Sequence, residues 1–471
     1  MRHTIRSVGL AGASFTRPAR EGAFTALAAT GSARTAAYLA RTLLRRAYAS
    51  APTKATTQAS PSRRNRILVL PRKGLNDDLM SSLLEMESIE VVTLPRRVVK
   101  AMAAAFLPGE VDDNNYISAS PAAQAAMANY RIFLTRFWQA FDPSGRIDAV
   151  VSGNFGYYAE RELAGTLEAL GVPFIALHKE NSWSLGSQAF WRQVYQERRG
   201  RFSGRRILVY SAIERDLQVD AGVVDLDRIE VVGMPRLDVV HRWREDNIGR
   251  IPTSTVLFAS FPSDVSMPVL KAPADNNGRR RGEPILALAG ITQHRGVTEL
   301  CTRAHRAILD LAVHSPEINI IVKSKGRARD RESIPRLFGV EKEADLPPNM
   351  QVMHGGSPLP FLAQAAVVGG LHSTLLLEAL AAGRPVVIPW FAEVLDPVIR
   401  DYVFDLRPTV IHTSSPEEFA EVLRDLALAP RAVPERLSPE VLKILREWLG
   451  NDDGKAGERT AAAILRAIQA N

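Results

Sequence analysis

The pattern of apolar and polar positions along the chain predicts two successive series of strands and helices. In the first series, short apolar runs typical of buried strands alternate with amphipathic segments typical of helices. The strands are predicted at 66–71 (RILVLP), 89–95 (IEVVTLP), 148–155 (DAVVSGNF), 173–180 (PFIALHKE), 205–211 (RRILVYS) and 229–235 (IEVVGMP). Helices are predicted at 76–87, 121–141, 158–170 and 186–199. This alternation is typical of βαβ units around a parallel sheet.

A second series follows the segment RLDVVHRWRED, and it repeats the same plan. Its strands are predicted at 255–261, 284–290, 318–325, 350–355, 365–370, 385–390 and 409–414. Its helices are predicted at 297–313, 373–382 and 416–428, with two more near the C-terminus at 438–448 and 454–469. Residues 263–283 are polar and rich in Pro, Gly and Asn, which predicts a surface loop.

The length of 471 residues is too great for one hydrophobic core. We therefore expect an α/β protein with two Rossmann-like, doubly wound domains, an N-terminal one at 66–245 and a second at 246–430, followed by C-terminal helices at 431–471. In such sheets, ligands bind outside the carboxyl ends of the strands, at the switch in strand order. The cleft between two such domains is the expected ligand site.

The net charge of +8 belongs to the first part of the chain rather than to these domains. Residues 1–66 hold twelve Arg or Lys and one acid, whereas the remainder holds 47 basic and 50 acidic residues. The predicted domains therefore lack the basic surface of a nucleic-acid-binding protein, and no nucleic acid is expected as a partner.

Residues 1–65 are interpreted as a basic extension, either disordered or amphipathic. Within it, Leu39 and Leu43 fall on one helical face, and Arg34, Arg41 and Arg45 fall on another. This composition is typical of an organellar transit peptide and equally of a helix on an anionic membrane surface. A disordered extension or an upstream start codon explains it as well. The alternatives stay open at this stage.

Several functional classes are excluded by what the sequence lacks. It contains no run of eighteen apolar residues that would span a bilayer, and its one cysteine, Cys301, excludes an intramolecular disulfide. It has no Walker A motif, no G-x-G-x-x-G after a strand, no H-E-x-x-H and no G-x-S-x-G. We expect a cytoplasmic protein without a metal or a cofactor.

The segment GGLHSTLLLEALAAGRPVVIPW, residues 369–390, is the main candidate for chemistry. A predicted strand ends in two glycines, and His372, Ser373 and Thr374 then open a helix whose amino end favours an anion such as phosphate. Glu378 lies one turn after Thr374 on the same face, near the open edge, where its carboxylate suits the vicinal diol of a ribose. The competing explanation is an ordinary N-cap at Ser373 and a solvated helix residue at Glu378.

The order strand, Gly-Gly, Ser-Thr, Glu, Gly-x-Pro, strand resembles the nucleotide-binding segment of GT-B glycosyltransferases and their relatives. The segment RIEVVGMPRLD at 228–238 is similar to the element that closes the first domain in bacterial capsule and surface-polysaccharide proteins, including polyglycerol-phosphate transferases and sugar-nucleotide 2-epimerases. The segments 315–326 and 349–370 match the strands that precede the Ser/Glu helix. The resemblance covers roughly 200–395 and is architectural over 66–200.

By this resemblance, the second domain binds a nucleotide-activated donor. The helix start with His372, Ser373 and Thr374 would hold the diphosphate, and Glu378 would hold the ribose hydroxyls. The remaining donor-binding candidates are Lys323, which would neutralise phosphate charge, His354, Gly355 and Gly356, which would shape the base pocket, and Asp396, which would hold sugar hydroxyls. A simple helix N-cap before Pro397 is the alternative explanation of Asp396. Lys323 departs from the family pattern, because it is followed by Ser-Lys in place of the usual Pro or His-Pro.

The first domain would supply the acceptor site and the catalytic base. His178 and Glu180 follow a predicted strand and are expected to face the cleft, where a base must remove the proton of an acceptor hydroxyl. A satisfied histidine and a helix cap explain these two residues equally well. Gly74 and Asn76, after the first strand, are candidates for binding the acceptor, and a capped glycine turn is the alternative.

The resulting hypothesis is a metal-independent GT-B glycosyltransferase. It would move a sugar, or alternatively a polyol phosphate, from a nucleotide-activated donor to a surface-polysaccharide or lipid-linked carbohydrate acceptor, with the basic tail as a possible contact to a membrane surface. A sugar-nucleotide 2-epimerase-like enzyme is the second hypothesis. A non-catalytic GT-B-fold binding protein is the third, and the altered Lys-Ser-Lys segment at 323–325 favours it.

Overall fold

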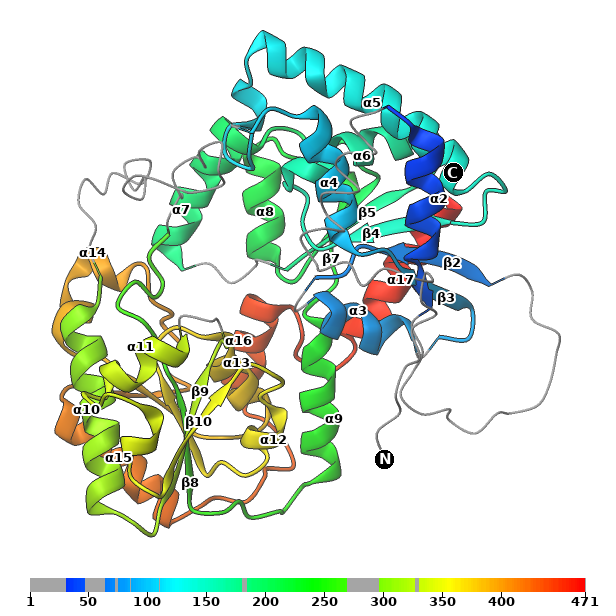
Figure 1. The fold of residues 1–471 in the computed structure, drawn as a ribbon. Helices are drawn as coiled ribbons and strands as arrows, with labels where there is room; N and C mark the ends of the chain where they lie inside the picture. Colours follow the sequence, from blue (N-terminus) through cyan, green and yellow to red (C-terminus); the bar gives the residue numbers. More distant parts are fainter. Residues whose placement is uncertain are drawn as a thin grey trace.

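The computed structural model describes most of the chain as two α/β domains (Figure 1). The described residues are 31–46, 64–72, 75–84, 86–109, 111–179, 184–268, 296–326 and 330–470. Within them, every helix is too short or too polar to cross a lipid bilayer.

The first domain is built on a seven-stranded sheet with the order β1-β3-β2-β4-β5-β6-β7. All neighbouring strands are parallel except β1, which pairs antiparallel with β3. The strands are β1 (Arg45–Arg46), β2 (Asn65–Val69), β3 (Ile89–Thr93), β4 (Ala149–Ser152), β5 (Phe174–His178), β6 (Arg206–Val209) and β7 (Ile229–Val231). The strand order reverses at β2, between β3 and β4.

Helices cover both faces of this sheet. They are α2 (Ala33–Thr42), α3 (Leu75–Leu83), α4 (Arg96–Phe106), α5 (Pro121–Phe141), α6 (Tyr158–Ala169), α7 (Leu185–Val194) and α8 (Ala212–Asp220), with a π-helical turn, η2, at Tyr195–Arg199. The chain leaves the domain through the short helix η4 (Pro235–Leu237) and α9 (Asp238–Asp246).

The second domain contains a six-stranded, fully parallel sheet with the order β10-β9-β8-β11-β12-β13. The strands are β8 (Thr255–Ala259), β9 (Asn319–Ser324), β10 (Met350–His354), β11 (Val367–Gly370), β12 (Val386–Pro389) and β13 (Ile411–Thr413). This is the 3-2-1-4-5-6 order of a Rossmann fold, with its switch point between β8 and β11.

The helices of the second domain flank this sheet. They are α10 (Thr298–His314), α11 (Asp330–Leu337), α12 (Leu359–Leu362), α13 (Thr374–Ala381), α14 (Pro397–Arg400) and α15 (Pro416–Leu428). The N-cap of α15 is Ser415, whose side chain accepts from the N–H of Glu418 at 3.1 Å, and Pro416 follows at the first helical position.

The chain ends with two helices that rejoin the first domain. After α16 (Pro439–Leu449), Gly450 adopts the left-handed conformation that ends the helix, and α17 (Ala456–Gln469) packs against α3 (Figure 1). Asp238 accepts hydrogen bonds from the N–H groups of Ala456 and Gly457, and Arg466 pairs with Glu230. The C-terminal helices expected at 431–471 are therefore partly a component of the N-terminal domain.

The strand predictions are confirmed wherever the structure describes the chain. The predicted strand at 284–290 and most of the loop at 263–283 lie outside the described residues. The prediction did not include α4, α8, α9 and α11. The expected fold class, two doubly wound α/β domains, is confirmed by the two sheets.

The assignment of the whole segment 1–65 to a tail is wrong for residues 31–46. Helix α2 buries Ala33, Ala36, Ala37 and Ala40 and packs against α5, and β1 extends the first sheet. The expected amphipathic helix is present, but its apolar side is covered by the protein itself. The remaining residues of the predicted tail up to 63 lie outside the described part of the chain.

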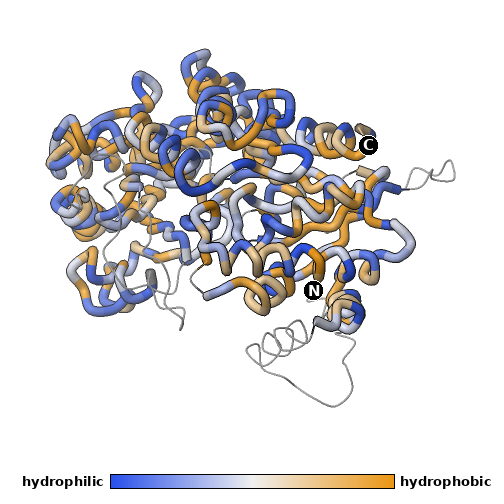
Figure 2. Tube along the Cα trace, turned by 90° about the horizontal axis from the view of Figure 1, so that it is seen from above, coloured by the Kyte–Doolittle hydropathy of each residue, from blue (hydrophilic) through white to orange (hydrophobic). Residues whose placement is uncertain are grey.

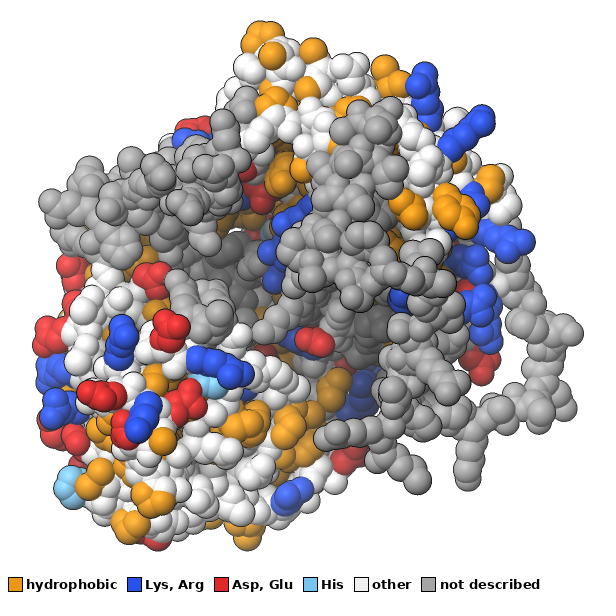
Figure 3. All heavy atoms as spheres, in the orientation of Figure 1, with side chains coloured by type: hydrophobic (Ala, Val, Ile, Leu, Met, Phe, Trp, Pro, Cys, Tyr) orange, Lys and Arg blue, Asp and Glu red, His pale blue; other side chains and the backbone are white. Residues whose placement is uncertain are grey.

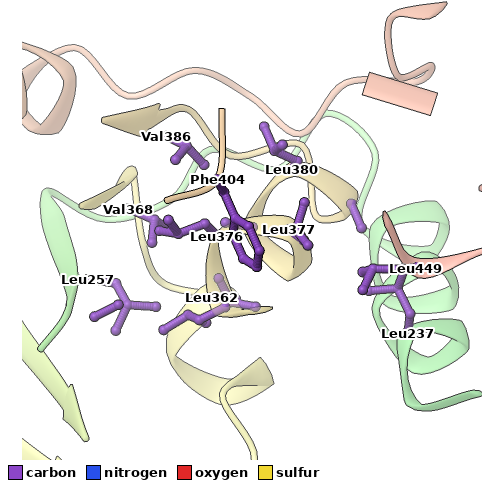
Figure 4. Packing of buried hydrophobic residues seen from close by; sticks show 14 of the residues in the cluster. Leu237, Leu257, Leu362, Val368, Leu376, Leu377, Leu380, Val386, Phe404 and Leu449 are labelled. Atoms are coloured by element: carbon purple, nitrogen blue, oxygen red, sulfur yellow. The ribbon is translucent and has the colours of Figure 1, made fainter. Parts of the chain in front are cut away.

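The buried apolar residues form two clusters. One occupies the α2, α5 and α6 face of the first sheet. The other runs from the α3 face of that sheet into the second domain. Figure 2 shows how hydrophobic and hydrophilic stretches alternate along the chain. Figure 4 shows α13 between the sheet residue Val368 on one side and Leu237 and Leu449 on the other. The apolar stripe of α13 therefore fixes this helix against both the sheet and the interdomain connection.

Candidate functional site

Helix α13 begins at the switch point of the second sheet. Gly370, the last residue of β11, pairs with Ala259 of β8, and Ala259 pairs on its other side with Lys323 of β9. A Cβ atom at Gly370 would lie 2.8 Å from the Cβ of Ala259, so a side chain would force these strands apart. The glycine thus lets the chain turn sharply from the sheet into the helix, where open α/β sheets bind their ligands.

Ser373 is the N-cap of α13, as the sequence predicts. Its hydroxyl accepts a hydrogen bond from the N–H of Leu375 at 3.3 Å. Ser373 and Thr374 are both partly exposed, whereas Leu375 and the rest of α13 are buried. The polar start of the helix is therefore the part accessible from solvent.

His372 is held as a neutral imidazole beside this helix start. Its Nδ1 accepts a hydrogen bond from the N–H of Phe404 at 3.3 Å, and its ring lies 3.7 Å from the Phe404 ring, centroid to centroid. Burial, with a smaller effect of the Lys325 charge, lowers the pKa of His372 to about 3. Since Nδ1 is the acceptor, the proton resides on Nε2, which makes that nitrogen a donor.

Lys323 lies at the carboxyl end of β9, among the group of predicted donor-binding residues. Its ammonium donates to the carbonyl of Gly355 at 2.6 Å and to that of Ser324 at 2.9 Å, and the residue is 8% exposed. These contacts tie the end of β9 to the turn after β10. The positive charge is thereby fixed at the same sheet edge as the start of α13.

His354, Gly355 and Gly356 form that turn, and the two glycines have positive φ angles of 68° and 75°. His354 contacts the Ser324 hydroxyl through Nδ1 at 3.0 Å and Glu343 through Nε2 at 2.5 Å. Ser324 therefore supports the turn. The structure brings the three residues together with Lys323, while their contact with a nucleotide base stays a prediction.

Glu378 shares a face of α13 with Thr374, and the two side chains are hydrogen-bonded. The expectation that Glu378 lies at an open edge is wrong, because the residue is 7% exposed. Burial raises the pKa of Glu378 to about 6, Arg236 and Lys323 act in the opposite direction, and Asp78 adds to the increase. The carboxylate therefore lies between the two domains rather than in bulk solvent.

Asp78, Tyr210 and Arg236 form the first-domain part of this charged cluster. The Arg236 Nη1 atom donates to Asp78 Oδ2 at 3.1 Å and to the Tyr210 hydroxyl at 3.3 Å, and Tyr210 donates to Asp78. The Arg236 backbone N–H donates to Asp78 Oδ1 at 3.2 Å. Burial raises the pKa of the Asp78 carboxyl, and the positive charge of Arg236 partly offsets this increase. At Arg236, burial acts to lower the pKa of the guanidinium, whereas the negative charge of Asp78 raises it.

These three residues were missed by the sequence analysis, although the signals were present. Arg236 belongs to the GMPRLD element that closes the first domain, and Asp78 belongs to the LNDD segment at the start of α3. Both segments were read as fold elements or caps. Nothing in a single sequence indicates that α3 and η4 contact each other, since the pair is 158 residues apart.

His178 does not face the interdomain region, which corrects the prediction. It is 2% exposed at the end of β5, with Nε2 at 3.0 Å from Glu214 and 3.3 Å from the Tyr195 hydroxyl. Because Tyr195 of η2 and Glu214 of α8 lie over the strand end, the imidazole is enclosed by its own domain. A base for an acceptor hydroxyl must reach the substrate, so His178 does not serve as that base in this structure. Glu180 lies outside the described residues.

The remaining predicted residues are placed as follows. Gly74 lies outside the described part of the chain, and Asn76 is exposed in the first turn of α3. The Asp396 side chain accepts a hydrogen bond from the N–H of Val398 at 2.8 Å and caps α14. The helix N-cap explanation therefore describes its role in this structure. Acceptor contact at Asn76 and sugar contact at Asp396 stay predictions.

The described residues contain no group of three or more His, Cys, Asp or Glu side chains able to hold a metal ion. A cavity of about 520 Å³ lies elsewhere on the first domain, where Tyr116, Arg131, Arg161 and Arg201 are among its lining residues. It contains none of the predicted site residues. The sheet edge at α13, rather than this cavity, unites the predicted groups. Figure 3 shows the surface hollowed between the two domains.

Comparisons with known proteins give structural neighbours but no sequence family. No family model and no curated protein matches the chain. The UDP-GlcNAc 2-epimerase of Neisseria meningitidis is 11% identical, with a TM-score of 0.43 over 86% of this chain and 100% of that chain. The wall teichoic acid polymerase TagF is 10% identical, with a TM-score of 0.42 over 71% and 75%. The glycotransferase of kitacinnamycin is 15% identical, with a TM-score of 0.43 over 86% and 100%. The fold assignment rests on the two sheets, which are parallel apart from β1.

Proposed function

We propose that this chain is a GT-B glycosyltransferase that moves a sugar from a nucleotide-activated donor to a carbohydrate acceptor of the cell surface. The observation that carries the proposal is the position of α13: its polar start lies at the switch point of the second sheet, beside Lys323, with Glu378 one turn further along. A diphosphate and a ribose, spaced as in a nucleotide, match this pair of features.

The diphosphate would contact the start of α13. The helix dipole favours an anion there, and Ser373 and Thr374 carry hydroxyl donors. His372 adds an Nε2–H donor without adding charge, because its pKa is far below neutral pH. Lys323 would stabilise the negative charge that develops on the departing diphosphate.

The ribose would contact Glu378. A carboxylate accepts hydrogen bonds from both hydroxyls of a vicinal diol, and the buried position makes these bonds stronger than they would be in water. The Thr374 hydroxyl, which is bonded to Glu378, orients the carboxylate for this contact. Arg236 approaches from the first domain, so closure of the domains and ligand binding would be linked through one side chain.

Nucleotide affinity tests the proposal directly. Calorimetric titration with a panel of nucleoside diphosphates should show binding to the wild type, and Glu378→Ala should weaken it by roughly 30-fold, the loss expected for about one hydrogen bond to a charged group. Glu421→Ala, which removes an exposed carboxylate on α15, is the matched control and should bind normally. Unchanged affinity in Glu378→Ala would remove the ribose contact from the proposal.

A sugar-nucleotide 2-epimerase-like activity is a second candidate. It is favoured by Asp78 and Glu378, two buried carboxyl groups whose pKa values are both raised and which could hold a proton beside the sugar. Incubation with a panel of sugar nucleotides and no acceptor separates the two functions. Conversion of the sugar alone supports the epimerase, whereas transfer that requires an acceptor supports the transferase. Including nucleotide-activated polyol phosphates in the panel tests the polyol-phosphate transferase alternative.

A further inference from the structure

A second group of cations lies at the switch point of the first sheet. Arg72 follows β2, Arg96 opens α4 after β3, and Tyr157 is the N-cap of α6 after β4. These three strands are neighbours in the order β3-β2-β4. The first domain therefore gathers these side chains at the position where a doubly wound sheet binds its ligand.

Tyr157 holds the two arginines at fixed positions. The guanidinium carbon of Arg96 lies 3.9 Å from the centre of the Tyr157 ring, and that of Arg72 lies 4.4 Å from it. Cation–π contacts of this kind orient the guanidinium planes. Tyr157 is 7% exposed, and within the described residues its buried hydroxyl has no hydrogen-bond partner. A buried phenol hydroxyl without a partner is costly, which indicates a missing acceptor.

Glu160 and Asp113 are two carboxylates that the structure describes near this group. Glu160 is 2% exposed and bonded to both Arg96 and Ser152. Lys100 lies one turn after Arg96 on α4, and partial burial together with the charge of Arg96 lowers its pKa. Glu160 therefore pairs with Arg96 and also acts on Lys100. Asp113 lies close enough to act on Lys100, but it also pairs with Arg199 at 3.9 Å.

We propose that Arg72, Arg96 and Tyr157 form a phosphate-binding site for the second substrate, so that the acceptor of the proposed transfer carries a phosphate group. Two guanidinium forks donate to phosphate oxygens in pairs, and a phenol hydroxyl donates one more hydrogen bond. Arginine suits this role better than lysine because its planar donors match the phosphate geometry. Figure 3 shows Lys and Arg side chains where the first domain turns toward the second.

The identity of the acceptor rests on the proposed function, but the phosphate site does not. Two sources provide the same chemistry: a soluble sugar or polyol phosphate, and a lipid-linked phosphate presented by a membrane. A site on the first domain leaves the start of α13 available for the donor. The two anion sites thus belong to different domains and can be disabled separately.

The test uses the full chain, two phosphate probes and two phosphate-free controls. Glycerol 3-phosphate represents the soluble source and polyprenyl phosphate in detergent micelles the lipid source, while glycerol and polyprenol are the phosphate-free controls. Wild type should bind at least one phosphate probe and neither control. Arg72→Gln and Arg96→Gln should each weaken binding about tenfold or more, as expected for loss of a charge-assisted hydrogen-bonded pair. Arg136→Gln, an exposed arginine on α5, is the matched control.

Tyr157→Phe removes only the hydroxyl, so it tests the site even if an arginine variant fails to fold. It should keep its melting temperature and lose several-fold in phosphate affinity. Nucleoside diphosphate affinity should stay unchanged in all three variants. If the wild type binds the phosphate probe but no nucleotide, the proposed function is refuted and the phosphate site is still supported. Absence of phosphate binding in the wild type, or equal binding in the wild type and all three variants, would overturn the site.

Discussion

The carboxyl ends of the two sheets both carry cations, but they hold them in different ways. In the second domain, Lys323 donates to two backbone carbonyls of its own sheet edge, and Glu378 lies within its electrostatic reach. In the first domain, Arg72 and Arg96 lie against one aromatic ring, and Glu160 pairs with Arg96. The second edge thus holds a lysine through backbone carbonyls, whereas the first holds two guanidinium groups through a tyrosine ring.

This difference indicates that the two edges select ligands differently. A site at a helix start favours a ligand of defined shape, in which the anion and the diol must both fit. A site built on two guanidinium groups favours a phosphate, and binding there should depend more strongly on salt. Between the two edges, Arg236 is bonded to Asp78 of the first domain and lies near Glu378 of the second, so it connects them.

Removal of Asp78 should give the largest effect, because it breaks this connection. Asp78→Ala leaves Arg236 and Tyr210 without their buried carboxylate and should lower the free energy of unfolding by about 3 kcal/mol, as for other broken buried pairs. Thermal and urea unfolding measure the loss. Asp77→Ala, on the same turn of α3 but exposed, is the control and should change little. A loss below about 1 kcal/mol in Asp78→Ala would mean that the two edges are not joined through Arg236.

Removal of Lys323 should separate the two edges functionally. Lys323→Ala should weaken nucleotide binding by about 2 kcal/mol, the value of a hydrogen bond to a charged group, and leave phosphate-probe binding at Arg72 and Arg96 unchanged. Lys342→Ala, whose side chain is 72% exposed, is the control for lost positive charge. If Lys323→Ala weakens both ligands equally, the two anion sites are one site and the comparison between them is wrong.

The sequence predicted the second edge better than the first. Local signals marked Ser373 as an N-cap and placed Thr374 and Glu378 on one helical face, and both features are confirmed. Periodicity likewise predicted the described strands. These properties depend on residues within one or two turns of each other, which a sequence displays directly.

The first edge depends on contacts between distant segments, which a single sequence does not display. Arg72, Arg96 and Tyr157 belong to three separate βα units, and they come together only when β3, β2 and β4 are adjacent. The burial of His178 has the same origin: Tyr195 and Glu214 cover it from η2 and α8. The strand end was correctly located, but the helices that fold over it decide which side chain remains accessible.

The protonation of Glu378 should make nucleotide binding dependent on pH. Its pKa of about 6 lies above its ordinary value of 4.5, so the native state binds a proton between these values and its charge is complete only above pH 6. If the ribose contact requires the carboxylate, affinity for a nucleotide sugar should fall roughly tenfold from pH 7.5 to pH 5, following the ionised fraction. Nucleotide sugars are the right probe because their diphosphate diester does not titrate in this range.

Glu378→Gln gives the matched comparison for this pH dependence. The variant should bind the nucleotide sugar more weakly than the wild type at pH 7.5 and show a flat profile down to pH 5. By linkage, the raised pKa also means that the wild type loses stability as pH increases from about 4.5 to 6, by about 2 kcal/mol, and Glu378→Gln should lack this loss. A pH profile shared by both proteins would assign the titration to Asp78 or to another group.

The smallest effect is expected at Ser373, and it distinguishes a cap from a binding residue. Ser373, Ser415 and Ser438 are all serine N-caps, and replacing any of them by alanine should lower the free energy of unfolding by about 1 kcal/mol. Only Ser373 lies at the switch point, so only Ser373→Ala should also weaken nucleotide binding, by severalfold. Calorimetry on the three variants compares them directly. If Ser373→Ala loses stability like the other two and binds nucleotide like the wild type, its hydroxyl only caps the helix, and the anion contacts at this edge come from the backbone, His372 and Lys323.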